Sequence, residues 1–365
     1  MKVAVQNLSF ALSKLISQVV VVGVAETEQN TLPSTSIAWP GVSVHTTKLL
    51  GPRRFSYSPA LASALRSESP DIIHLHGLWR YTSVAANSWS SQSYKPLAIS
   101  THGMLAPSAL TFNKLHKRIV SLLFQQRVLD EAQCLFASSA RELEDIRNYG
   151  LKNPVAVIPH GVQKLSENTL TIPKEKVVLY MGRLHPIKGI ETLISSWTKL
   201  ENSFPDWQLQ IVGPDSQGYR NKLERQIEAA RLRSVKIKSQ VGERERNRMM
   251  AAAEFTVLPS QSENFGLVVA ESLMASTPVI ANSGAPWEGL LAHNCGLWIN
   301  RGTDELTSAL RKMMRLPDQD RHSMGERGRD WMLDEFTWDS IAQKHELAYK
   351  WLLGDSNRPE FIALN

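Results

Sequence analysis

The amino-acid sequence predicts an α/β protein in which two doubly wound, parallel-sheet domains follow one another along the chain. The length of 365 residues favours two domains, and hydrophobic and charged fractions of 42% and 21% are those of a globular protein. Short segments that are apolar on both faces alternate with segments of helical periodicity through both halves. This alternation is typical of parallel strands covered by helices on both sides.

The first half supplies one helix and five strands before its pattern ends. Apolar residues over 3–16 have helical spacing, and 19–24 form a continuous apolar strand. The other expected strands are Ile72–Leu75, Leu97–Ser100, Cys134–Ala137 and Ala156–Pro159. We therefore expect residues 1–162 to form the first domain.

A polar linker precedes the second half, in which the same alternation restarts. Polar residues dominate 163–175, and Pro173 lies near the end of this stretch. The expected strands beyond it are Val177–Tyr180, Gln208–Val212, Val235–Ile237, Phe255–Leu258 and Pro278–Ala281. Residues 163–337 are thus expected to form a second domain, followed by a helix over 338–353. Ligands of such sheets bind beyond the carboxyl ends of strands, so the active site is expected in a cleft between the domains.

Composition excludes several classes of protein. The formal net charge of +6 comes without a long Lys/Arg run, which disfavours a nucleic-acid partner and suits an anionic substrate or membrane surface. The two cysteines, Cys134 and Cys295, have no metal-ligand spacing, so a structural zinc site is not expected. No run approaches the roughly 20 apolar residues of a membrane span. With no signal-peptide pattern at the N-terminus, we expect a cytoplasmic protein.

Two glutamates flank a turn from strand to helix. Glu263 lies in the loop after an apolar strand, and Glu271 lies inside the following helix. Gly266 falls near the helix start, where backbone N–H groups and the helix dipole favour an anion. Two carboxylates on either side of an anion-binding helix N-terminus suit a nucleotide-sugar, which has a phosphate between two groups of hydroxyls. Taken alone, Glu271 would be interpreted as a solvated helix residue rather than as a ligand-binding group.

A second motif follows the first strand of the second half. Gly182 permits a tight turn, and Arg183 and Lys188 bracket that turn at the carboxyl end of the strand. A departing nucleoside diphosphate needs positive charge where its negative charge develops, and two fixed cations supply it. Either cation alone would be read as a surface charge.

These two motifs, Gly182–Gly189 and Glu263–Glu271, resemble the signature of the retaining glycosyltransferase family four, also called group 1. The resemblance covers roughly residues 70–350 and includes the segments 71–77, 101–103, 157–162 and 211–214. It implies the GT-B fold, in which two Rossmann-like domains face a central cleft. It also implies that the C-terminal helix, within 338–365, packs back on the first domain.

The resemblance implies a role for each matching residue. Gly182, Arg183 and Lys188 would bind the donor diphosphate, and a loop near the nucleotide would begin at Gly213. Glu263 would contact hydroxyls of the transferred sugar, and Glu271 would accept hydrogen bonds from the ribose. Backbone amides would approach sugar and phosphate at four positions: Asn264, Phe265, Gly266 and Leu267.

His102, which follows a strand of the first domain, would lie near the transferred sugar and act in catalysis. The alternative for His102 is a buried, hydrogen-bonded core histidine. His74 and His76 lie at the neighbouring strand end, and the same two readings stay open for them.

The implied enzyme is a retaining hexosyltransferase that uses a UDP-, GDP- or ADP-sugar. Its acceptor is expected to be a glycan, and a lipid-linked one in bacterial surface polysaccharide biosynthesis, such as lipopolysaccharide or exopolysaccharide. No cofactor or metal is expected, because the two cations and the helix terminus can stabilise the diphosphate. Glu263 is expected to act by its charge and position. The alternatives are a nucleotide-sugar epimerase or phosphorylase of the same fold, or a catalytically impaired nucleotide-sugar-binding protein.

Some features depart from the family pattern. No glycine precedes Gly23, so the first strand and glycine-rich loop of the family are expected to be missing from the first domain or to lie upstream of residue 1. Asp318 and Asp320 have the D-x-D spacing of metal-dependent glycosyltransferases, but their place before a helical run also fits helix capping. His160 occupies a position where asparagine is usual.

Residues 113–129 combine basic and apolar residues in one helical pattern. Such a helix could rest on an anionic membrane surface as a peripheral contact, where lipid-linked acceptors reside. The alternative is a core-packed helix with a solvated face.

Overall fold

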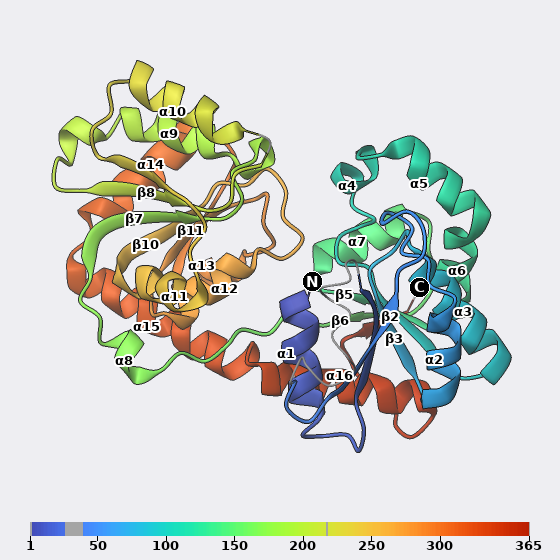
Figure 1. The fold of residues 1–365 in the computed structure, drawn as a ribbon. Coiled ribbons are helices and arrows are strands. Elements are labelled where there is room, and N and C mark those ends of the chain that lie inside the picture. The colour runs from blue at the N-terminus through green and yellow to red at the C-terminus, as the bar shows by residue number, and fades with distance from the viewer. Residues whose placement is uncertain (1, 26–38, 217, 365) are drawn as a thin grey trace. The chain divides into compact units, whose positions relative to one another are not determined.

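The computed structural model describes residues 2–25, 39–216 and 218–364, and the chain divides into two compact units (Figure 1). Unit 1 comprises Met1–Gly161 and Trp338–Asn365, and unit 2 comprises Val162–Thr337. Both units are α/β, as the sequence predicted. The chain passes into unit 2 one residue before the boundary expected from the sequence.

Unit 1 contains a five-stranded sheet and a separate two-stranded sheet. The order of the larger sheet is β13-β6-β5-β4-β3, parallel except for β13 at its edge, and β1 pairs with β2 in parallel. The strands are β1 (Val20–Ala25), β2 (Ser43–Lys48), β3 (Ile73–His76), β4 (Leu97–Ser100), β5 (Cys134–Ala137), β6 (Val155–Val157) and β13 (Ile362–Ala363). The sequence located five of them. It missed β2, which is mostly polar, and β13, which has two residues.

Helices cover both faces of the larger sheet. They are α1 (Lys2–Leu12), α2 (Ala60–Glu68), α3 (Tyr81–Ser93), α4 (Pro107–Thr111), α5 (Lys114–Val120), the π-helical segment η2 (Ser121–Gln125), α6 (Gln126–Glu131), α7 (Ala140–Asn148) and α16 (Trp338–Leu353). Along β5, Cys134 and Phe136 pack with α1 and α16, while Leu135 joins the cluster on the other face. This alternation explains why each strand is apolar on both faces.

The N-terminal helix precedes the first strand of the described residues, as the sequence predicted. Helix α1 is shorter than expected and ends at Leu12. It packs beside α16, so the C-terminal helix belongs to the core of unit 1 (Figure 1).

Unit 2 is built on one six-stranded parallel sheet of order β12-β11-β10-β7-β8-β9. The strands are β7 (Glu175–Met181), β8 (Gln208–Val212), β9 (Val235–Lys238), β10 (Ala253–Leu258), β11 (Val279–Asn282) and β12 (Gly296–Ile299). Five were predicted. The sequence missed β12, an edge strand whose residues Leu297–Ile299 are only partly buried.

Two helical layers enclose this sheet, with α9, α10 and α14 on one face and α11, α12 and α15 on the other (Figure 1). The helices are α8 (Glu167–Leu170), α9 (Ile190–Thr198), α10 (Tyr219–Ala229), α11 (Glu243–Ala252), α12 (Leu267–Met274), α13 (Gly289–Ala292), α14 (Thr303–Arg315) and α15 (Asp318–Glu335), with the 3₁₀ segments η3 (Pro186–Lys188) and η4 (Glu201–Ser203). The predicted polar linker over 163–175 contains the short helix α8.

Candidate functional site

Glycines allow the turns after three strands of unit 2 to approach one another closely. The Gly182 N–H donates to the Val212 carbonyl at 3.0 Å, and a Cβ on Gly213 would lie 1.8 Å from the Gly182 oxygen. Gly189 has φ +69°, and a Cβ there would lie 2.1 Å from the Pro259 oxygen. Because the turns after β7, β8 and β10 approach this closely, the side chains they carry share one edge of the sheet.

Lys188 and Glu263 meet at this edge. The Lys188 Nζ lies 2.5 Å from Glu263 Oε1, and their side chains are 15% and 12% exposed. The Ser260 hydroxyl donates to the same carboxylate oxygen at 2.7 Å. The structure thus joins two predicted site residues that are 75 positions apart in a mostly buried ion pair.

Both partners of this pair keep bonding capacity. An ammonium has three N–H donors, and within the described residues Glu263 is the partner of the Lys188 ammonium. Glu263 Oε2 accepts no hydrogen bond from the described part of the chain, and a carboxylate oxygen accepts readily from hydroxyls. The pair can therefore offer two donors to an anion and one acceptor to a sugar.

Arg183 lies on the same turn, with an exposed side chain. Its carbonyl accepts a hydrogen bond from the Tyr180 hydroxyl at 3.0 Å, which fixes the backbone. Across residues 2–25, 39–216 and 218–364 its guanidinium forms no ion pair. It is available to an anionic ligand at the end of β7.

The loop before α12 is held by a tryptophan. Gly266 is the N-cap of α12 with φ +80°, a conformation that favours glycine, and Leu267 begins the helix. The Trp287 Nε1–H donates to the Phe265 carbonyl at 2.5 Å, and the two rings lie 5.1 Å apart. The backbone over Asn264–Leu267 is thereby fixed at the helix N-terminus, where an anion is favoured.

Glu271 lies on α12 beside Arg246 of α11. The Arg246 Nη1 is 3.1 Å from Glu271 Oε1, and the two side chains are 32% and 24% exposed. Burial raises the pKa of Glu271, while the charge of Arg246 opposes that rise. This pairing excludes the reading of Glu271 as a solvated residue.

Sequence reasoning missed Arg246 and the supporting role of Trp287. Arg246 is one of several charged residues on α11, and only packing against α12 singles it out. Trp287 acts on Phe265, 22 positions away in the sequence, so no local pattern marks its role.

His102 lies in unit 1, directly after β4, and lines a small cavity with His76 and His160. Its Nε2 is 3.0 Å from His76 Nδ1, and its backbone has φ +49°, which is unusual for a residue with a side chain. Burial lowers the pKa of His102, and the negative charge of Glu142 opposes this change. The role of His102 in catalysis stays a prediction.

His74 fits the core reading. It is hydrogen-bonded at both ring nitrogens, with Nδ1 at 2.6 Å from the Tyr349 hydroxyl and Nε2 at 2.8 Å from the Ser100 hydroxyl. Burial is the main reason why its pKa is well below the ordinary value. We assign His74 to the core of unit 1.

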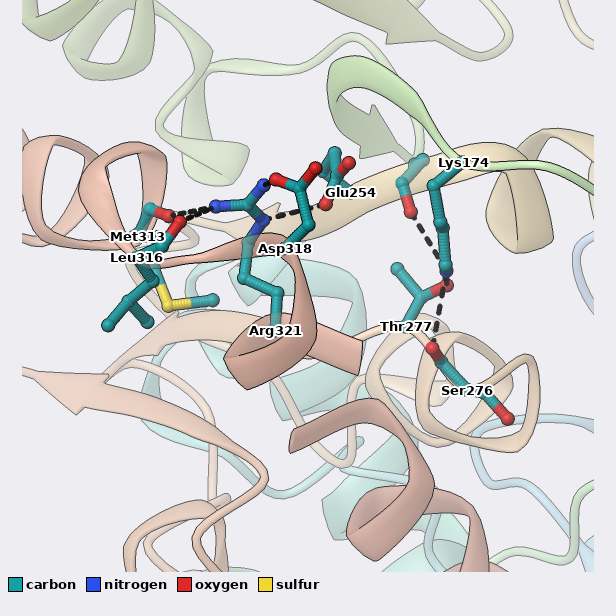
Figure 2. A network of polar contacts seen from close by, with 9 residues as sticks. Lys174, Glu254, Ser276, Thr277, Met313, Leu316, Asp318 and Arg321 are labelled. Carbon is teal, nitrogen blue, oxygen red and sulfur yellow. Dashed lines mark hydrogen bonds and ion pairs between the residues drawn. The ribbon is translucent and has the colours of Figure 1, made fainter. Parts of the chain in front are cut away.

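The D-x-D segment belongs to a structural network (Figure 2). Arg321, which is buried, bonds Glu254 Oε2 at 2.6 Å and also contacts the Asp318 carboxylate. The helix-capping expectation was wrong, because the N-cap of α15 is Pro317 and no side chain caps it. The described residues hold no group of three His, Cys, Asp or Glu arranged for a metal ion.

Two family models match consecutive parts of the chain. Residues 162–331 match "Glycosyl transferases group 1", and residues 1–161 match "Glycosyl transferase 4-like domain". The division between the models falls at the division between the two units.

Curated relatives carry glycosyltransferase names. A D-inositol 3-phosphate glycosyltransferase of Corynebacterium aurimucosum is 30% identical over 258 residues, which are 62% of this chain and 58% of that protein. A GDP-mannose:cellobiosyl-diphosphopolyprenol alpha-mannosyltransferase of Xanthomonas oryzae pv. oryzae is 27% identical over 278 residues, 73% of this chain and 69% of that protein. The similarity thus spans about three fifths of the length of the first of these relatives.

Solved structures show the same fold. HepE of Anabaena, in complex with UDP and glucose, has a TM-score of 0.74 at 19% identity, covering 95% of this chain and 96% of that one. WaaG, described as a glycosyltransferase involved in lipopolysaccharide biosynthesis, has a TM-score of 0.68 at 16% identity, covering 96% and 95%. These likenesses show the GT-B fold that the sequence predicted. With family models matching both units, the chain belongs to the group 1 glycosyltransferase family.

Proposed function

We propose that this protein is a retaining hexosyltransferase that moves a sugar from a nucleotide-sugar donor to a glycan acceptor. The observation that carries the proposal is the Lys188–Glu263 pair at the glycine-lined edge of the unit 2 sheet. One partner suits a diphosphate and the other suits sugar hydroxyls. The names of the relatives and the UDP and glucose bound by HepE support the same donor class.

The charge of each site residue determines its role in the transfer. As the bond between the anomeric carbon and the diphosphate breaks, negative charge grows on the leaving oxygen, and Lys188 and Arg183 stabilise it. The acceptor hydroxyl bonds through its oxygen to the anomeric carbon on the same face of the sugar, and its proton passes to the departing diphosphate oxygen. Glu263 orients the sugar hydroxyls and stabilises positive charge on the ring, while Glu271 accepts hydrogen bonds from the ribose.

We further propose that transfer requires no divalent metal. Two cations and the N-terminus of α12 supply the positive charge that a metal would otherwise supply. Turnover is expected to be the same with EDTA as with added Mg²⁺ or Mn²⁺. Turnover that depended on the ion would overturn this part of the proposal.

Turnover of sugar nucleotides tests the main proposal. The protein should release nucleoside diphosphate from one of the UDP-, GDP- or ADP-sugars when a glycan acceptor is present, and NMR of the product should show a retained anomeric configuration. Epimerised sugar nucleotide without acceptor would indicate an epimerase. Release of sugar 1-phosphate would indicate a phosphorylase. Binding without any turnover would favour an impaired nucleotide-sugar-binding protein.

One surface of unit 1 favours the proposal that the acceptor is lipid-linked. Residues 114–131 form α5, η2 and α6 in succession, in place of one regular helix. Leu115, Leu122 and Leu123 are 74%, 81% and 74% exposed, and Lys114 and Arg118 are exposed beside them. Exposed leucines with flanking cations are the pattern of a helix that lies in an anionic membrane interface.

None of the described helices is both long enough and apolar enough to cross a bilayer. From their exposed side chains, we propose a peripheral membrane contact made by Leu115, Leu122, Leu123 and their basic neighbours. A lipid-linked acceptor in surface polysaccharide biosynthesis would be reached from such a position.

Vesicle sedimentation tests this contact. The protein should bind vesicles containing phosphatidylglycerol and should bind pure phosphatidylcholine weakly. Leu122→Ser/Leu123→Ser should lose binding by about tenfold or more, because each side chain buries apolar area in the interface. Leu347→Ser, which removes an exposed leucine from α16, is the matched control. Equal binding by both variants would contradict the proposal.

A further inference from the structure

A buried carboxylate lies under the turn that carries His102. Glu142 of α7 is 2% exposed, and its Oε1 accepts from the Thr101 hydroxyl at 2.6 Å and from the Gly103 N–H at 2.5 Å. Its Oε2 accepts from the backbone N–H and the hydroxyl of Ser138, both at 2.7 Å. One carboxylate oxygen therefore holds the residues on both sides of His102.

The turn held in this way is strained. His102 has φ +49° and Gly103 has φ +70°, so two successive residues adopt the left-handed region. For a residue with a side chain this conformation is energetically costly, and it persists only when its surroundings impose it. The two bonds to Glu142 Oε1 impose it here.

The held turn aims the imidazole at a second histidine. The His102 Nε2 lies 3.0 Å from His76 Nδ1, and burial lowers the pKa of both rings. Near neutral pH both rings are uncharged, so one nitrogen donates and the other accepts, and each ring fixes the tautomer of its partner. A shift of the Thr101–Gly103 turn would break this arrangement.

From this geometry we infer that Glu142 is a positioning residue for sugar transfer, which acts by holding His102 in its strained turn and by placing a negative charge near its ring. This inference rests on the proposed function and on the role predicted for His102. Glu142 touches no substrate in this account. Its effect reaches the reaction only through His102.

The charge of Glu142 has a separate, measurable effect on the titration of His102. Although burial opposes it, the hydrogen bonds from Ser138, Thr101 and Gly103 lower the pKa of Glu142, which keeps it ionised. Its charge raises the pKa of His102 against the effect of burial. The other titratable groups that line the same cavity are His76, His160 and His345. Removing the charge of Glu142 should therefore move the titration of His102 to lower pH.

The test compares Glu142→Gln with the parent protein by kinetics and by NMR. Glutamine keeps the shape and removes the charge, and its NH₂ group replaces one of the two oxygens that accept the hydrogen bonds from Thr101, Gly103 and Ser138. The turn that carries His102 is therefore held less tightly. We expect kcat to fall by roughly 10-fold to 100-fold, the usual cost of a misplaced catalytic group, with KM for the donor unchanged. If activity needs neutral His102, the acid limb of the pH–rate profile should move to lower pH.

Two further variants separate positioning from folding. Thr101→Val removes one bond to Glu142 and keeps the charge, so kcat should fall while the acid limb stays in place. In a His102→Ala background, Glu142→Gln should have no further effect on kcat, because both changes act through one residue. Additive losses in this double variant would overturn the inference, as would parental kcat in Thr101→Val.

An NMR titration of the His102 ring needs no turnover, and its resonance can be assigned with His102→Ala. A midpoint at lower pH in Glu142→Gln supports the inference even if the protein transfers no sugar, which would count against the proposed function alone. An unmoved midpoint overturns it. If Glu142→Gln does not fold, Thr101→Val becomes the test of the inference. Its NMR spectra should show a changed His76–His102 pairing. Spectra identical to those of the parent protein would overturn the inference.

Discussion

At the scale of single residues, the site depends on charges that are paired before any ligand arrives. Lys188 and Glu263 hold each other in a mostly buried position, with Ser260 bonded to the same carboxylate oxygen. Preorganisation of this kind spares the reaction the cost of reorienting charges at the moment of transfer.

Lys188→Ala should lower donor turnover by on the order of 10²–10³, the usual loss for one preorganised charge donor. The loss should appear in kcat, because the leaving group gains its charge in the transition state. Lys236→Ala, on the exposed side of β9, is the control and should be neutral. Unchanged turnover in Lys188→Ala would remove Lys188 from the site.

Gly213→Ala tests the close approach of β7 and β8. Its Cβ would lie 1.8 Å from the Gly182 oxygen, so the strand ends must separate. We expect a loss of unfolding free energy of about 1–3 kcal/mol and weaker donor binding. Gly23→Ala, where a Cβ meets nothing within 4 Å, should show neither effect in the same denaturant titrations. A fully stable Gly213→Ala with normal binding would show that the close approach is not required.

Residue-level prediction from the sequence succeeded where a local motif existed. The turn at Gly182 and the loop at Glu263 are local patterns, and the structure brings Lys188 and Glu263 together. Arg246, Trp287 and Glu142 were missed, because their partners come from other elements and no short pattern marks them.

At the scale of elements, strands were predictable when both of their faces are covered. The core strands β4 and β5 appear at the expected residues because their apolar runs are unbroken. The polar strand β2 lacks that signal. The edge strand β12 has a short apolar run, Leu297–Ile299, but these residues are only partly buried. The basic segment after residue 113 was expected as one helix, but a π-helical turn, η2, interrupts it and no local residue pattern announces such a turn.

Two buried histidines, His160 in the segment after β6 and His345 of α16, predict how unit 1 responds to acid. Burial lowers the pKa of His160 and of His345 to about 4. The unfolded chain has histidine pKa values near 6.5, so between about pH 6.5 and 4 the unfolded state binds more protons. Stability should therefore fall as the pH falls through this window, by a few kcal/mol for the two residues together.

Thermal unfolding from pH 7.5 to 4.5 measures this effect. The transition of unit 1 should shift to lower temperature, and the transition of unit 2 can be recognised because a nucleotide ligand raises it. His322→Gln, a change at an exposed histidine of α15, is the control and should leave the pH dependence intact. A unit 1 transition that does not move between pH 6.5 and 4.5 would contradict the account.

At the scale of the whole molecule, the predicted diphosphate-binding and sugar-binding residues other than His102 all lie in unit 2. The match of residues 162–331 to the group 1 family model falls in this unit. The sequence predicted the α/β class and the family, because these depend on patterns repeated along the whole chain. Donor base, sugar and acceptor were not predictable, because the shape of the pocket sets them.

The most direct test of the central claim, a nucleotide-sugar site in unit 2, is a thermal-shift screen. UDP, GDP, ADP and their common sugars would be compared for the parent protein, Glu271→Ala and Glu228→Ala, the last an exposed glutamate of α10. A ligand at a hundred times its Kd should add roughly 2.7 kcal/mol of stability. We expect one nucleotide family to stabilise the parent and Glu228→Ala but not Glu271→Ala. Stabilisation by none of them, or equal stabilisation of Glu271→Ala, would contradict the claim.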